Sequence, residues 1–131
     1  MAVGIDLVSV REIERSIERF GDRFLRRLFT EDEIAYAVSS PPRAAERLAA
    51  RFAAKEAVKK ALGPHADSAV WRQIEVRRTP AGSPEIRLHG AAREAAAAAG
   101  ISELALSLSH EGDYAVALVA AARQARERDE R

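Results

Sequence analysis

The chain contains no cysteine, which excludes disulfides, thiolate zinc sites and a cysteine nucleophile and is typical of a reducing compartment. It also lacks any apolar run long enough to span a bilayer, and its N-terminal stretch already meets charge at Asp6, unlike a signal peptide. We therefore expect a soluble, cytoplasmic protein that makes no membrane contact and whose fold is held together by packing alone.

An excess of charge of one sign is also missing, and aromatic side chains are scarce. The 21 lysines and arginines are balanced by 20 aspartates and glutamates, and aromatic residues make up only 5% of the chain. General nucleic-acid binding needs a basic field and stacking surfaces, so we expect no nucleic-acid partner. At 131 residues the chain is long enough for one domain with a real core and short for two.

The first part of the chain combines a strand pattern with a basic helical pattern. Val3, Ile5 and Leu7 recur at the period of a strand with one face buried, which turns Asp6 away from Ile5. Apolar residues at helical spacing follow over residues 11–28, and arginines fill many of the positions between them. The sequence thus predicts a strand followed by an amphipathic, strongly basic helix.

Helix signals mark the next boundaries. The basic helix is interrupted near Gly21. Thr30 and Glu33 have the spacing of a capping box, which predicts a helix over residues 31–38. A longer helix is predicted over residues 43–62, where a glycine and a proline follow directly and end it.

Strand patterns dominate the second half of the chain. Two hairpins are predicted, over residues 74–88 and 104–121, with an Ala-rich helix over residues 91–99 between them. Residues 123–131 are almost entirely polar and predict a frayed tail after a single domain of residues 1–122. The order of elements predicts an α+β fold with helices packed on one face of a mostly antiparallel sheet.

Two segments carry the residue types of a phosphate-handling site. Glu56 and Lys60 lie four residues apart in the Ala-rich helix, so a carboxylate and an ammonium share one helix face. Asp6 lies in an apolar strand, where a charge is costly unless something satisfies it. A second carboxylate and a hard metal ion would do so, and the set indicates a magnesium site for a phosphate substrate.

Each of these features also has a simpler interpretation. Glu56 and Lys60 have the spacing of an ordinary surface salt bridge. Asp6 has the position of a residue that caps a turn or pairs with an arginine, and His110 that of an exposed turn residue rather than a phosphate contact. The arginines of residues 11–27 form either a solvated face or a docking strip for an acidic partner.

Three segments in this order resemble one enzyme family. They are GIDLVSVREIE at residues 4–14, RFAAKEAVKKALG at residues 51–63 and SLSHEGDYAVALV at residues 107–119. Together they are similar to the signatures of the holo-(acyl-carrier-protein) synthase group of 4'-phosphopantetheinyl transferases, and the likeness runs over residues 3–119. It implies transfer of the phosphopantetheine arm of coenzyme A to a serine of apo acyl carrier protein, with release of adenosine 3',5'-bisphosphate.

The resemblance also implies roles for individual residues. Asp6 and Glu56 match the family's magnesium-binding acids, and Lys60 matches its phosphate-binding lysine. Arg51 and His110 match positions that meet the nucleotide end of coenzyme A. The proton of the serine hydroxyl passes either to Glu56 or to a metal-bound water, and the sequence does not separate these two routes.

Carrier proteins are acidic, so the basic helix is the expected docking strip. The residues assigned to it are Arg11, Arg15, Arg19, Phe20, Arg23 and Phe24. Members of this family are typically homotrimers with active sites at subunit interfaces, and we expect the same here. The alternative function is a non-catalytic module that keeps the fold and binds a carrier protein or a nucleotide.

Two positions depart from the family pattern. Residues 64–68 replace a flexible loop of serine or threonine and glycine, and their role stays open. Ser83 lies where the Gly-x-Pro turn often carries lysine or arginine, so one cation expected near the nucleotide is missing. Neither the sequence nor the resemblance tells a fatty-acid carrier protein from a polyketide one.

Overall fold

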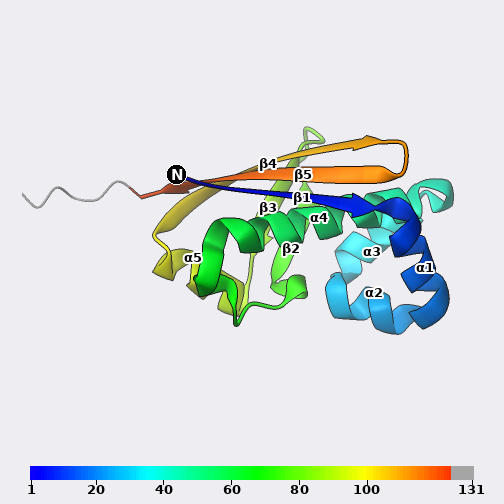
Figure 1. The fold of residues 1–131 in the computed structure, drawn as a ribbon, viewed down its shortest axis with the longest axis horizontal. Helices are drawn as coiled ribbons and strands as arrows, with labels where there is room; N and C mark the ends of the chain where they lie inside the picture. Colours follow the sequence, from blue (N-terminus) through cyan, green and yellow to red (C-terminus); the bar gives the residue numbers. More distant parts are fainter. Residues whose placement is uncertain (125–131) are drawn as a thin grey trace, which may run out of the picture.

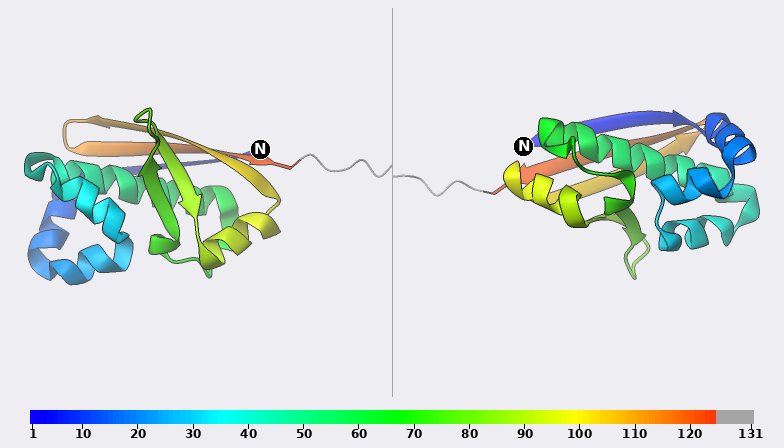
Figure 2. Two further views of the ribbon diagram at one scale, coloured as in Figure 1. Left: turned by 180° about the vertical axis from the view of Figure 1, so that it is seen from behind. Right: turned by 90° about the horizontal axis from the view of Figure 1, so that it is seen from below.

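A three-stranded antiparallel sheet and one long helix form the framework of the protein (Figure 1). The computed structural model describes residues 1–124. The strands of the main sheet lie in the order β1 (Ala2–Ser9), β5 (Tyr114–Arg123) and β4 (Ile101–Glu111). A separate two-stranded sheet of β2 (Ile74–Arg78) and β3 (Pro84–Leu88) runs across the long direction of the main sheet (Figure 2).

The helices lie on one side of the main sheet (Figure 1). They are α1 (Val10–Phe20), α2 (Asp22–Leu28), α3 (Glu31–Val38), α4 (Ala44–Leu62) and α5 (Gly90–Ala98). Short 3-10 turns connect them, namely η1 (Pro41–Arg43), η2 (Gly63–Ala66) and η3 (Trp71–Gln73). The predicted α+β fold is confirmed, although the strands form two sheets rather than one.

The local signals in the sequence correspond to real helix boundaries. Gly21 separates α1 from α2 with a φ of 57°, a conformation that glycine adopts without strain. Thr30 and Glu33 form the predicted capping box at the start of α3. The tail was predicted to begin at residue 123, but Arg123 is the last residue of β5. Residues 125–131 of the predicted tail lie outside the described part of the chain.

The long helix α4 packs directly against β1. It is rich in alanine, and the small side chains of Ala53, Ala57 and Ala61 are buried between helix and sheet. Gly4 lies so close that a Cβ atom built on it would be 1.9 Å from the carbonyl oxygen of Ala57. This close approach fixes which residues of β1 face the helix.

The buried face of β1 is the one that carries Asp6, not the one that the apolar alternation marks. Gly4 and Val8 are buried against the helices, whereas Val3, Ile5 and Leu7 are 60%, 57% and 61% exposed. The face with Val3, Ile5 and Leu7 points away from α4, although it is the more apolar one. Gly4 is on the opposite face, and only a glycine there allows the backbones of β1 and α4 to approach so closely. Ile5 pairs with Leu118 of β5, so the outer face of the sheet carries an uncovered apolar surface.

The turn between β4 and β5 is fastened to the start of α1. Ser9 Oγ donates a hydrogen bond of 2.7 Å to Asp113, and the Arg11 backbone N–H donates another of 2.9 Å. The hydrogen bond from Ser9 is the main cause that lowers the pKa of Asp113. The contact positions the basic helix relative to the end of β4, where His110 lies.

Among the described residues, no helix has both the length and the hydrophobicity to cross a bilayer.

Candidate active site

Asp6 and Lys60 meet where β1 lies against α4. Lys60 Nζ donates to Asp6 Oδ1 over 2.9 Å and to the Ile5 carbonyl oxygen over 2.8 Å. The side chain of Asp6 is 20% exposed and that of Lys60 is 56% exposed, so solvent and a ligand can reach both. Lys60 therefore pairs with Asp6 rather than with Glu56, which corrects the surface salt bridge that the spacing allowed. The partner of Asp6 is a lysine and not an arginine.

Glu56 lies one helical turn before Lys60 and is held by a different partner. Its Oε2 atom accepts a hydrogen bond of 2.9 Å from the indole Nε1 of Trp71. Trp71 lies in η3 after the loop that follows α4, and its ring lies 6.2 Å from the ring of Phe52. The ammonium of Lys59 lies 4.4 Å from the centre of the Trp71 ring. This partner of Glu56 was not predicted.

The donor set suits a magnesium ion. Within residues 1–124 no group of three or more His, Asp or Glu side chains could hold a metal. Magnesium, however, is commonly bound by one or two carboxylates plus water and substrate phosphate. Asp6 Oδ2 and Glu56 Oε1 accept no hydrogen bond from any described residue, and the ammonium on Asp6 shows that this carboxylate attracts a cation. Metal binding by this pair stays a prediction.

A second group of cationic side chains surrounds Tyr36. The guanidinium groups of Arg47, Arg51 and Arg78 lie 4.2, 4.4 and 5.3 Å from the centre of its ring. Arg51 is only 4% exposed, and its Nε is buried without a hydrogen-bond partner among the described residues. Burial is the main cause that lowers the pKa of Arg51, and the charges of Arg78 and Arg47 lower it further. Arginine stays protonated even so, and the cluster is suited to an anion.

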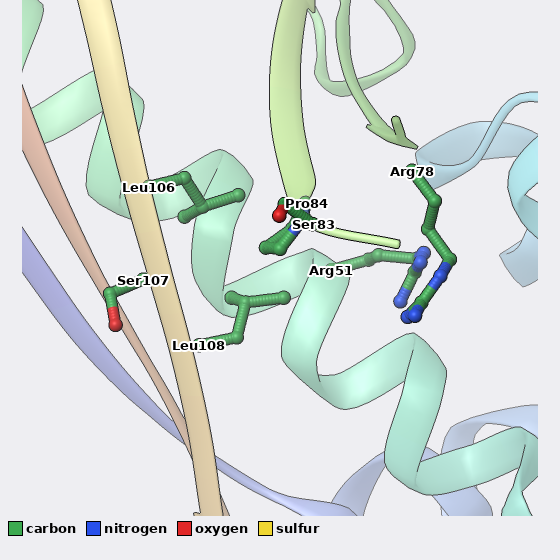
Figure 3. Close-up of a pocket in the computed structure, with 7 residues that line it drawn as sticks. All are labelled: Arg51, Arg78, Ser83, Pro84, Leu106, Ser107 and Leu108. Atoms are coloured by element: carbon green, nitrogen blue, oxygen red, sulfur yellow. The ribbon is translucent and has the colours of Figure 1, made fainter. Parts of the chain in front are cut away.

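Two cavities open beside these arginines. One of about 430 Å³ lies between α4, β4 and the β2–β3 turn, and Figure 3 shows Arg51 and Arg78 pointing toward each other at its edge. The other, of about 200 Å³, is lined by Arg51 and also by His110, whose Nδ1 lies 3.3 Å from Glu46 Oε2. The structure thus brings the predicted pair Arg51 and His110 to one hollow.

Arg78 was missed by the sequence analysis. It lies opposite Pro84 in the register of the hairpin, and its Nη2 would be 3.4 Å from a Cβ atom on Gly82. Its guanidinium therefore lies beside the turn in which Ser83 stands at the position often occupied by a cation. The predicted hairpin contained Arg78, but nothing in the hairpin pattern showed that its guanidinium would lie beside Tyr36 and Arg51.

The two groups do not meet within one chain. Arg51 and Glu56 are five residues apart on α4, which separates them by about 7.5 Å along the axis and about 140° around it. No hydrogen bond or ion pair in the described part of the chain joins the Asp6, Glu56 and Lys60 group to the Arg51 and His110 group. A single subunit presents them on different faces of the same helix.

The inner face of α4 carries a buried ion pair that was also missed. Lys55 is fully buried, and its Nζ donates to Glu33 Oε1 over 2.8 Å and to the carbonyl oxygens of Trp71 and Ile74 over 3.0 and 2.6 Å. Burial is the main cause that lowers the pKa of Lys55, and the charge of Glu33 opposes the shift. Glu33 in turn accepts from the Val76 N–H over 2.9 Å. The network ties α3, α4, η3 and β2 together.

The predicted docking residues are exposed except Phe24, which is half-buried against the core. Arg11, Arg15 and Arg19 follow each other at four-residue spacing on α1, and none forms an ion pair with a described residue. A hollow of about 410 Å³ continues this surface, and it is lined by Phe20, Arg23, Phe24 and Arg27. Phe20 is 54% exposed. The geometry joins a basic stripe to an aromatic hollow, and its use for docking stays a prediction.

Comparison with known proteins places the chain in a family. The model of the 4'-phosphopantetheinyl transferase superfamily matches residues 2–119. The chain therefore belongs to the 4'-phosphopantetheinyl transferase superfamily, as the resemblance implied.

Similar proteins carry one particular name. The holo-[acyl-carrier-protein] synthase of Koribacter versatilis is 48% identical over 120 residues, which cover 91% of this chain and 95% of the relative. The synthase of Herpetosiphon aurantiacus is 44% identical over 122 residues, covering 91% and 96%. Among solved structures, the synthase of Neisseria meningitidis superposes with a TM-score of 0.84 at 34% identity, covering 93% of this chain and 98% of that one. The Helicobacter pylori synthase in complex with coenzyme A superposes with a TM-score of 0.77 at 31% identity, covering 92% of this chain and 99% of that one.

Proposed function

We propose that this protein is a holo-(acyl-carrier-protein) synthase. It transfers the 4'-phosphopantetheine arm of coenzyme A to a serine hydroxyl of apo acyl carrier protein and releases adenosine 3',5'-bisphosphate. The observation that carries the proposal is the contact between Asp6 of β1 and Lys60 of α4, with Glu56 one helical turn before Lys60, in a chain of this superfamily. The complexes of similar synthases with coenzyme A support the choice of donor.

The chain's own residues account for the charge changes of this reaction. The serine oxygen forms a new bond to the phosphorus of the arm, and the bond from that phosphorus to the leaving bisphosphate breaks. Lys60 supplies a positive charge to the pyrophosphate as negative charge grows on its oxygens. Asp6 and Glu56 are the residues that would hold magnesium, which supplies further charge stabilisation when bound. The serine proton passes to Glu56 or to a water beside it.

The direct test is a mass measurement. Purified protein is incubated with coenzyme A, magnesium and an apo carrier protein, and the carrier is analysed by intact mass spectrometry. A gain of one phosphopantetheine arm on the carrier serine, dependent on all three components, supports the proposal. An unmodified carrier in a reaction where a known synthase modifies it completely would refute it. Fatty-acid and polyketide carriers, run in parallel, separate the two substrate classes.

We also propose that the carrier protein docks on α1 and α2. The arginines of α1, which form no ion pair within residues 1–124, and the adjacent aromatic hollow fit an acidic partner with an apolar patch. Replacing Arg15 and Arg19 together by glutamate is expected to raise the KM for carrier protein by roughly tenfold and to weaken its dependence on salt. The KM for coenzyme A should stay the same, since neither arginine lines the two cavities beside Arg51.

Steady-state kinetics at several salt concentrations check this expectation. Arg87→Glu on β3 is the matched control, because it reverses a charge of the same kind on a different element. An unchanged KM for carrier protein in the double variant would contradict the docking proposal and show that these arginines only face solvent.

The third proposal is a homotrimer with shared active sites. The outer face of β1 and β5 carries an exposed apolar surface formed by Val3, Ile5, Leu7 and Leu118. A surface of this kind fits contact with another subunit. Leu104, Leu106 and Leu108 of β4 pack against the core and are not part of this surface. Because Glu56 and Arg51 point to different faces of α4, a neighbouring subunit that brings its Arg51 and His110 to Glu56 would complete the site.

Subunit mixing tests the shared site. Asp6→Asn protein and His110→Ala protein, each impaired alone, are expected to recover part of the wild-type activity after subunit exchange, because some interfaces receive two intact halves. Mixing Asp6→Asn with Glu56→Gln is the control, and it should give no recovery because both changes lie in the same half. A monomeric sedimentation profile of active protein, or equal recovery in both mixtures, would contradict the model.

A further inference from the structure

We propose that Trp71 is a positioning residue for Glu56. Its indole N–H donates to Glu56 Oε2 over 2.9 Å and holds this oxygen, while Oε1 accepts no hydrogen bond from a described residue and is left for the reaction. This inference rests on the proposed function, since it assigns the orientation of a residue of that site. Nothing in the sequence motifs around Glu56 points to Trp71, which is 15 residues further along the chain.

Trp71 is itself held from three sides. Its carbonyl oxygen accepts from the buried ammonium of Lys55 over 3.0 Å, which fixes the backbone of η3. Its ring packs against Phe52 on one α4 position and receives the ammonium of Lys59 at 4.4 Å from another. The indole therefore reaches Glu56 from a backbone that is anchored to the protein interior.

The physical effect is a restriction of the carboxylate. Glu56 is half-buried on the side of α4 that meets Lys60, and a glutamate in such a place has several rotamers within reach. The indole nitrogen is only a donor, so it can bind the carboxylate oxygen but cannot compete for a cation or a proton. Donors that bind a metal-ligating side chain orient it, and their loss typically costs about 10- to 100-fold in affinity or activity.

Trp71→Phe removes the N–H and keeps an aromatic ring. We expect kcat to fall by roughly tenfold, with the KM values for coenzyme A and carrier protein changed by less than about twofold because the substrate contacts remain. Phe52→Leu is the matched control, because it loosens the packing of the same indole and leaves its N–H in place. This control is expected to lower the melting temperature and to keep the wild-type kcat.

The chain contains one tryptophan, so a nitrogen–proton correlation spectrum shows one indole resonance. We expect this resonance to move in Glu56→Ala and to stay in place in Glu94→Ala, an exposed glutamate of α5. The spectrum requires no activity, so it decides the contact independently of the reaction.

The outcomes are separable. An unmoved indole resonance in folded Glu56→Ala overturns the contact, and a wild-type kcat in Trp71→Phe overturns the positioning role while leaving the transferase activity intact. An equal loss of kcat in Phe52→Leu also overturns it, because packing rather than the N–H would then be responsible. Failure of the wild-type protein to modify any carrier is instead a failure of the proposed function.

Discussion

Asp6→Asn and Glu56→Gln are each expected to lower turnover by about 100-fold or more, with the fold intact. Each change keeps the size of the side chain and removes one anionic oxygen ligand from the predicted magnesium site. Asp6→Asn also removes the negative charge opposite Lys60, which leaves the ammonium with neutral acceptors such as the Ile5 carbonyl oxygen. Single-turnover and steady-state assays over a range of magnesium concentrations measure the loss.

Glu94→Gln serves as the control for this pair. It removes a carboxylate from the exposed side of α5 and is expected to leave kcat and the melting temperature unchanged. Melting temperatures of the two site variants separate a chemical loss from unfolding. Near-wild-type rates in both variants at saturating magnesium would remove Asp6 and Glu56 from the metal site and leave Lys60 as the main phosphate contact.

Gly4→Ala is expected to destabilise the protein by about 3 kcal/mol or more. The new methyl group would lie 1.9 Å from the carbonyl oxygen of Ala57 and 2.8 Å from its carbonyl carbon, so β1 and α4 must move apart. The same movement separates Asp6 from Lys60, and activity is expected to fall even in molecules that stay folded. Urea unfolding at equilibrium, together with the transfer assay, measures both effects.

Two comparisons isolate the cause. Gly112→Ala forces alanine into a φ of 57° but meets no atom within 4 Å, so it is expected to cost only about 1 kcal/mol. Adding Ala57→Gly to Gly4→Ala should not restore stability, because the clash is with the backbone of Ala57 and not with its methyl group. Rescue by this second change, or a stability equal to the wild type, would contradict the close approach.

The elements of this fold were largely predictable because their signals are local. The capping box of Thr30 and Glu33, the break at Gly21 and the two hairpins depend on neighbouring residues, and each is found where the sequence placed it. The inner face of β1 was not predictable in this way. Alternation shows that a strand has two faces, but the choice between them depended on a glycine that lets a distant helix approach.

The candidate site was predictable only as far as its motifs reach. Asp6, Glu56 and Lys60 stand in segments with recognisable spacing, and the structure brings Asp6 and Lys60 into contact. Trp71 and Arg78 lie in segments that the sequence assigned to ordinary structure, and only the packing of η3 and of the hairpin places them beside the other residues. Contacts between segments that carry no shared pattern had no signal in one sequence.

Lys55 and Glu56 are neighbours in the segment RFAAKEA, but the first has a structural role and the second belongs to the candidate active site. Lys55 joins three segments through Glu33, Trp71 and Ile74, and its replacement by an apolar residue would leave these acceptors unpaired in the interior. Glu56, one position later, makes none of these hydrogen bonds and meets the network only at the Trp71 indole. A descendant of this protein that lost transfer and kept only the binding of a carrier protein or nucleotide would thus be expected to retain the lysine and lose the glutamate, so the pair distinguishes a working enzyme from an inactive copy of its fold.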